Sequence, residues 1–267
     1  MTSLLVITLA AFVLLALIII VLIKTTRLRL WQGLILFLLP LVAANLLWFS
    51  WAVPQQQQAR QHDQAASYLA QTPGYRVLQT QEPALWQLLT QELTRRVRAG
   101  EPVEQATGEL RGWLLDVINQ RLMRGTDAAV VNYIGVSVEE MQALNARDPG
   151  LCFRFLYPQV NGGVNLVKIL PPSLNHKEAE AMEQLLLNSA PQQQPMDSVL
   201  AQRDLKQVVA QLYQRWGDKL QQLNMPADTA VDRSSMCAMS IDLYSAILAL
   251  PDKRAANLLR RMFAVSG

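Results

Sequence analysis

Two long apolar runs open the chain. Leu4 to Ile23 is a run of 20 residues without a charged side chain, and Trp31 to Val53 is a second run of 23 residues. At about 1.5 Å of rise per residue, the first run makes roughly 30 Å of helix, which is the thickness of a bilayer's hydrocarbon core. Tryptophans at both ends of the second run fit the aromatic belts of membrane helices. The pattern predicts a two-span transmembrane anchor over residues 1–53.

Three cations decide the expected topology of this anchor. Residues 1–53 contain no Asp or Glu, and their only charged side chains are Lys24, Arg27 and Arg29, which lie in the short connection between the two runs. Positive residues next to membrane spans stay in the cytoplasm, so both termini are expected on the far side. A secretory signal peptide would carry its charges before a shorter apolar core, which favours a retained helix. The expected location is a bacterial inner membrane with the rest of the chain in the periplasm.

After the second run the pattern becomes amphipathic and helical. Residues 54–81 are polar and are expected to form a stalk and linker, in which Tyr75 to Thr80 can also be extended. Residues 82–267 are expected to form an α-helical soluble domain, because apolar positions recur there at intervals of three and four. Pro83 and Pro102 are expected to begin two of its helices. The fold class is therefore all-α, a transmembrane hairpin followed by a multi-helix bundle.

Two parts of this domain stand out. Residues 148–170 are rich in Gly and bounded by Pro, and they are open to two interpretations, a buried short helix or a hairpin. A Gln-rich segment flanked by Pro marks a possible sub-boundary at 190–196. The clearest helix then runs from about Asp197 to Leu223, with Leu205, Val209 and Leu212 on one apolar face that is expected to be part of the core.

Helix caps are expected at three places. Thr126 is a plausible N-cap. Ser137 with Glu140, and Asn175 with Glu178, have the spacing of a residue that caps a helix and an acidic residue three positions later. These patterns predict helix starts close to each of the three positions.

Cys152 and Cys237 are the only cysteines. Their apolar neighbours predict that both side chains are buried, and the expected periplasmic location is oxidising. A disulfide between them would close a loop of 85 residues and stabilise the fold by roughly 4 to 5 kcal/mol in the chain-entropy model. Two inert buried thiols are the alternative.

The residues needed for common chemistries are scarce. His62 and His176 are the only histidines, and neither has metal ligands at a typical spacing. No cofactor is therefore expected, and most catalytic triads lack a base. Glu101, Glu104 and Glu109 lie on the exposed side of a helix, which is a solvated face rather than a glycosidase pair.

Clustered arginines are candidates for a contact with anionic lipid or with a partner. Arg95, Arg96 and Arg98 lie near a helix C-terminus, where cations oppose the negative end of the dipole. Arg260 and Arg261 are interpreted in the same way, as residues of a solvated helix end. Beyond residue 53 the 21 acidic side chains balance the 21 remaining basic ones, since 24 minus 3 is 21. The basic pI therefore does not indicate a nucleic-acid partner.

These observations favour a membrane-tethered, non-enzymatic interaction, scaffold or assembly module at the periplasmic face, with the lipid bilayer and an envelope protein as partners. Two alternatives stay open. One is a periplasmic hydrolase acting on envelope material, which a deep polar pocket with convergent carboxylates would favour. The other is an oligomerising membrane hairpin that packs at Gly33, Asn45 and Ser50.

Overall fold

The computed structural model describes residues 53–266 and the isolated positions 21, 31, 35, 38, 39, 42, 43, 46 and 50. The chain divides into two compact units, residues 1–61 and residues 62–267. Apart from those isolated positions and Val53, the expected spans Leu4 to Ile23 and Trp31 to Val53 lie outside the described residues, as do Lys24, Arg27 and Arg29. No helix among the described residues is both long and apolar enough to cross a bilayer.

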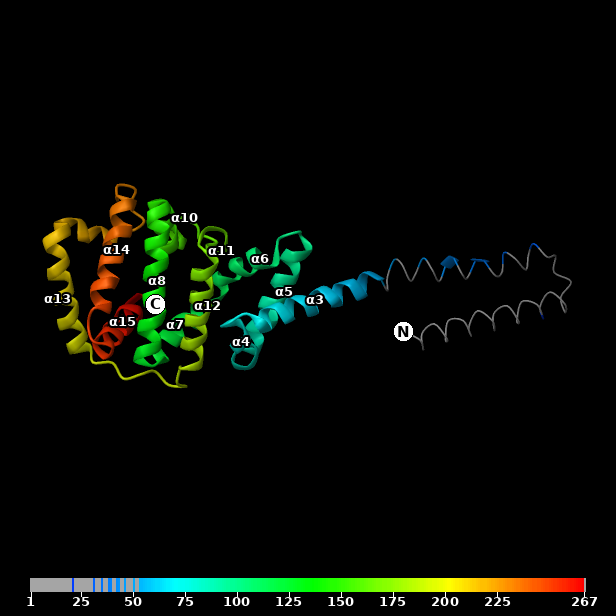
Figure 1. Ribbon diagram of the computed structural model, residues 1–267, viewed down its shortest axis with the longest axis horizontal. Coiled ribbons are helices and arrows are strands. Elements are labelled where there is room, and N and C mark those ends of the chain that lie inside the picture. Colours follow the sequence, from blue (N-terminus) through cyan, green and yellow to red (C-terminus); the bar gives the residue numbers. More distant parts are fainter. Residues whose placement is uncertain are drawn as a thin grey trace. The chain divides into compact units, whose positions relative to one another are not determined.

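All the regular elements between residues 53 and 266 are helices, which confirms the all-α class for this part of the chain. The only backbone pairing of the strand type there is an isolated antiparallel bridge between Gly125 and Ser189. Figure 1 shows that only part of the helices of the second unit surround the long helix α8 (Asp127–Arg147), while others lie to one side of it.

The first helices do not form a free stalk. Helix α3 spans Val53–Gln71, and α4 spans Tyr75–Gln81 where an extended segment was one of the expectations. Ala65 and Leu69 from α3 are 4% and 0% exposed and belong to the hydrophobic core, as do three residues of α4. Only the N-terminal part of the expected stalk therefore lies outside the second unit, which begins at His62.

The next helices begin where the prolines predict. Helix α5 spans Pro83–Arg98, with Pro83 in its first turn, and ends before Gly100, whose φ of 93° is in the left-handed region that favours glycine. The helix expected after Pro102 is interrupted. It consists of α6 (Val103–Glu109), the 3₁₀ helix η2 (Leu110–Leu114) and α7 (Leu115–Arg124).

Helix α8 (Asp127–Arg147) is the centre of the unit. Its buried residues occur on several sides, as expected for a helix that neighbours surround. It contacts α9 (Pro149–Leu156), α12 (Pro172–Leu187), α14 (Arg233–Leu248) and α15 (Asp252–Ser266). In Figure 1 it lies between α12 and α14.

The segment expected to be the least helical forms three short helices, so the helical interpretation is correct. These are α9, α10 (Pro158–Asn161) and α11 (Leu166–Ile169). Phe153 and Cys152 of α9 are both 0% exposed. Helix α9 packs against α8 and α14. All three helices are short because prolines and glycines divide the segment.

The connection at residues 190–196 lies within the second unit. The backbone N–H of Gln194 donates to the carbonyl of Met123 (3.0 Å), and Asn257 bonds both the N–H (2.8 Å) and the carbonyl (2.9 Å) of Asp197. Helix α13 (Ser198–Trp216) follows, capped by Asp197, and then the 3₁₀ helix η3 (Gly217–Asn224). The long helix expected here is thus broken at Gly217, whose φ of 53° no other residue adopts easily.

Candidate functional site: an apolar groove along α13

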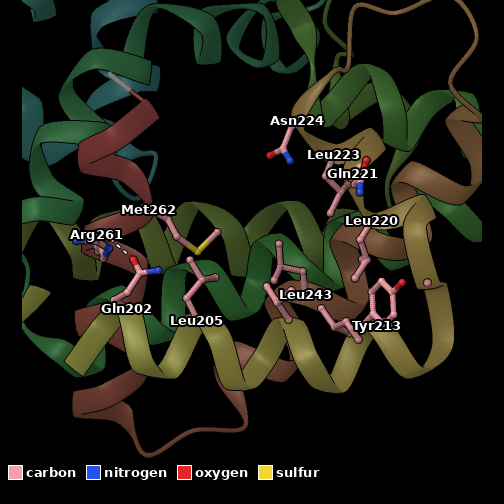
Figure 2. A pocket seen from close by; sticks show the side chains of 13 residues that line it. Gln202, Leu205, Tyr213, Leu220, Gln221, Leu223, Asn224, Leu243, Arg261 and Met262 are labelled. Atoms are coloured by element: carbon pink, nitrogen blue, oxygen red, sulfur yellow. Dashed lines mark hydrogen bonds between the residues drawn. The ribbon is translucent and has the colours of Figure 1, made fainter. Parts of the chain in front are cut away.

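A cavity of about 620 Å³ opens between α13, η3, α14 and α15, and we call it the α13 groove. Thirteen residues line it, and Figure 2 shows how their side chains lie. Apolar side chains form most of its walls: Leu205, Val209, Leu212, Leu220, Leu223, Leu243 and Met262. Its size and apolar lining are those of a small-molecule site.

The groove exists because α13 carries more apolar surface than its neighbours cover. Ala201 and Val208 are no more than 2% exposed and face the core, whereas Leu212, 6% exposed, also borders the groove. Val209 and Tyr213 are 42% and 53% exposed and line the groove instead. The apolar face expected to belong to the core is therefore only partly buried. Gly217 then turns the chain into η3, which returns Leu220 and Leu223 to the same cavity.

One end of the groove is cationic. Arg261 donates a hydrogen bond from Nη2 to Oε1 of Gln202 (2.8 Å), and both residues lie at the end of the row of α13 side chains opposite Tyr213 (Figure 2). Lys206 is exposed and lines an adjoining hollow that shares Gln202, Leu205, Val209 and Tyr213 with the groove. The groove thus combines apolar walls with positive charge at one end.

A second feature of the unit is a largely buried cluster of ion pairs. Arg111 of η2 pairs with Glu140 of α8 through two hydrogen bonds, Nη1 to Oε1 (3.1 Å) and Nη2 to Oε2 (3.2 Å), and lies 3.4 Å from Glu178 of α12. The guanidinium also stacks over the ring of Phe155 at 5.4 Å. We call Arg111, Glu140 and Glu178 the Arg111 centre. It links three helices that are far apart in the sequence.

Burial dominates the electrostatics of this centre. The Glu140 side chain is 0% exposed, and burial raises the pKa of its carboxyl to about 7, although Arg111 lowers it and Glu178 raises it further. Burial also raises the pKa of the Tyr133 hydroxyl beside Arg111. A single guanidinium here faces two carboxylates, so the centre has one more acidic than basic group.

Two cavities adjoin the Arg111 centre. One, of about 650 Å³, is lined by Arg111, Tyr133 and Phe155 among others. The other, of about 390 Å³, is lined by Glu104 and Glu178 among others. Oε1 of Glu178 is buried and has no hydrogen-bond partner among the described residues. It does form the ion pair with Arg111.

The two cysteines are joined. Cys152 of α9 and Cys237 of α14 form a disulfide with their Cα atoms 5.9 Å apart, and both are 0% exposed. The bond lies in a hydrophobic cluster with Val138, Met141 and Leu144 of α8. It joins α9 to α14, and both of these helices pack against the central helix α8.

Two of the candidate arginines of α5, Arg95 and Arg96, share a neighbouring carboxylate. Glu92 accepts hydrogen bonds from Nε of Arg95 (2.7 Å) and from Nε of Arg96 (2.9 Å). The bond from Arg95 is the main reason why the pKa of Glu92 falls to about 2. Arg96 also approaches Glu101 at 3.4 Å, so the cluster is less cationic than the sequence suggests.

Three interpretations of local sequence were wrong. Arg260 is buried, with its side chain 3% exposed, and it bonds the carbonyl of Gly125 (2.7 Å) and Asp127 (2.8 Å). Ser137 does not cap a helix, because it lies inside α8 and donates to the carbonyl of Tyr133 (3.2 Å). Asn175 does not cap α12, because this helix begins at Pro172. Thr126, by contrast, caps α8 as expected.

The two histidines lie outside both the α13 groove and the Arg111 centre, although one of them lines a cavity beside that centre. His62 is exposed on α3, and His176 of α12 lies 3.4 Å from Glu180 and contributes to the wall of the 390 Å³ cavity. Within the described residues, no group of three or more His, Cys, Asp or Glu side chains could hold a metal ion. Comparison with family models, curated proteins and solved structures finds no match to this chain.

Proposed function

We propose that this chain is a membrane-tethered, non-enzymatic interaction module of a bacterial inner membrane, in which the helical unit lies in the periplasm and binds an envelope component. The observation that carries the proposal is the α13 groove. An open apolar cavity of about 620 Å³ leaves side chains such as Val209 and Tyr213 in contact with water, which costs stability unless a ligand covers them.

Three observations support the membrane tether and the periplasmic location. The uncharged runs Leu4 to Ile23 and Trp31 to Val53 are each long enough to span a bilayer. Six described apolar residues between positions 31 and 46 are 45% to 74% exposed, which suits a lipid environment. The disulfide between Cys152 and Cys237 is typical of an oxidising compartment.

Reporter fusions test the topology. Alkaline phosphatase fused after Gly267 of the full chain is expected to be active, because it folds only where disulfides form. Green fluorescent protein inserted after Leu30, in the connection that holds Lys24, Arg27 and Arg29, is expected to fluoresce. A C-terminal fluorescent fusion together with an inactive phosphatase fusion would place the helical unit in the cytoplasm and overturn the location.

Site-specific photocrosslinking tests the groove as the binding site. A benzophenone amino acid in place of Val209 is expected to form adducts in living cells, because this side chain points into the groove. Val199 is the matched control, since it lies on the same helix and is 83% exposed but does not line the groove. Adducts that are equally frequent from both positions, or absent from Val209, would contradict the proposal.

One observation favours a hydrolase as a second candidate. Glu178 has a buried carboxylate oxygen without a hydrogen-bond partner at the wall of the 390 Å³ cavity, and Glu104 lines the same cavity. A carboxylate in such a position can serve as a general base. Cell-wall and lipid fractions incubated with the full-length protein test this candidate. It requires turnover by the wild-type protein and its loss in Glu178→Gln.

A further inference from the structure

We infer that the ligand of the α13 groove is a lipid with one acyl chain and an anionic head group, drawn from the adjacent bilayer. This inference rests on the proposed function, because it names the envelope component that the groove binds. It follows from the length of the groove, from the extent of its lining and from the placement of its charges.

The length suits a single acyl chain. The α13 residues that line the groove run from Gln202 to Tyr213, which at 1.5 Å per residue is roughly 16 Å. One leaflet of a bilayer has a hydrocarbon thickness of about 15 Å, half of the usual 30 Å, and an acyl chain is about as long. Leu205, Leu243 and Met262 lie along this path in Figure 2. An acyl chain extended along the groove would cover them.

The number of residues that line the groove is too small for a stable interface with a protein. The groove is lined by 13 residues. A stable protein interface uses about 20 to 30 residues on each side. A cavity with few polar groups at its edge is instead typical of a site for a small ligand.

The charges at one end favour an anionic head group. Neighbouring arginines are neutralised by carboxylates: Arg254 pairs with Asp204 (2.6 Å) and Arg260 with Asp127 (2.8 Å). Arg261 bonds the neutral amide of Gln202, and no carboxylate within residues 53–266 pairs with it. Lys206 adds a second positive charge beside Gln202. A carboxylate or phosphate head group at this end would gain charge-assisted hydrogen bonds.

The opposite end of the groove offers no such contact. Tyr213 donates its hydroxyl to Asp218 (2.8 Å), and the nearby side chains Gln221 and Asn224 are uncharged. The electrostatics therefore fix one orientation, with the head group at Arg261 and the chain directed towards Leu220 and Leu223.

Photolabelling with site mapping tests this inference. The full-length protein, reconstituted in nanodiscs of zwitterionic phospholipid, is illuminated with a palmitate that carries a diazirine on its chain, and the modified peptides are identified by mass spectrometry. Adducts are expected in peptides that contain Leu205, Leu220 or Met262. Labelling of residues 1–53 reports partition into the bilayer and serves as the internal reference.

Variants separate the head-group site from the chain site. Arg261→Gln is expected to reduce groove labelling about tenfold, because one charge-assisted hydrogen bond is lost, whereas Lys253→Gln, at an exposed position outside the groove, leaves it unchanged. Hexadecanol that carries a diazirine has no anionic head group. It is expected to label the wild-type groove as weakly as the palmitate probe labels the groove of Arg261→Gln. Val209→Trp is expected to block labelling by filling the groove at a position that is 42% exposed.

The outcomes distinguish this inference from the proposed function. Palmitate labelling that is confined to residues 1–53, or that Arg261→Gln does not change, overturns the inference. If the benzophenone at Val209 then captures a protein, the interaction module stands with a different partner. If neither probe reports the groove, both proposals fail.

Discussion

The side of the helical unit built around α8 and the side built around α13 differ in how completely their side chains are covered. Around α8, Glu140 is fully buried and its two oxygens each accept a hydrogen bond from Arg111. Along α13, Val209 and Tyr213 remain exposed beside a cavity, and within residues 53–266 Arg261 bonds only the neutral amide of Gln202. The first arrangement stabilises one conformation, and the second leaves binding energy available for a ligand.

This difference separates residues that hold the fold from residues that are available for function. Substitutions on the α8 side are expected to change the free energy of unfolding strongly. Substitutions in the α13 groove are expected to change ligand binding with little effect on stability. The measurements below test this separation, and all of them use the full chain in nanodiscs, with urea unfolding followed by circular dichroism.

Removing the disulfide is expected to have the largest effect. Cys152→Ser combined with Cys237→Ser opens a loop of 85 residues, which should lower the free energy of unfolding by about 4 to 5 kcal/mol. Reduction of the wild-type protein should lower the free energy of unfolding by a similar amount. A change below about 1 kcal/mol would mean that the packing of α9 against α14 is sufficient without the bond.

Breaking the Arg111 centre is expected to cost nearly as much. Arg111→Met leaves Glu140 and Glu178 without their cation in a buried environment, which should destabilise the unit by about 3 to 5 kcal/mol. The control is Lys177→Met, because the pair of Lys177 with Glu139 is about half exposed and should contribute no more than about 1 kcal/mol. Equal effects of the two variants would show that the centre is not a special element of the fold.

The same centre predicts an unusual pH dependence. The pKa of Glu140 is about 7 in the folded protein, above its ordinary value of 4.5, so the folded state binds more protons between these values. The contribution of Glu140 to the free energy of unfolding is therefore fully present below about pH 4.5. It is lost as the pH rises through 7, and the loss is about 3 kcal/mol at most. Glu140→Gln should remove this slope between pH 5 and 8. A stability that rises over this interval in the wild-type protein would contradict the burial argument.

The sequence predicts best what depends on neighbouring residues. Pro83 and Thr126 mark helix starts correctly, because a proline in the first turn and a side-chain cap act within one turn. The all-α class follows from the same local periodicity. The anchor itself remains a prediction, since its residues lie almost entirely outside the described part of the chain.

Long-range partners explain the errors. Glu140 has capping-box spacing after Ser137, but its real partner is Arg111, 29 positions earlier. Arg260 has the pattern of a solvated helix end, but it bonds Gly125, 135 positions away. The groove was missed for a related reason. The periodicity of α13 shows that one face is apolar, but only the positions of α14, α15 and η3 decide how much of that face they cover.

The smallest expected effect provides the sharpest test of the comparison, because it uses two adjacent valines of α13. Val208 is 2% exposed and faces the core, whereas Val209 is 42% exposed and faces the groove. Val208→Ala removes buried carbon atoms and should cost about 2 kcal/mol. Val209→Ala should change the stability by less than about 0.5 kcal/mol, because little apolar surface is lost and alanine favours the helix. If the two variants cost the same, the groove is closed in solution and α13 is an ordinary core helix.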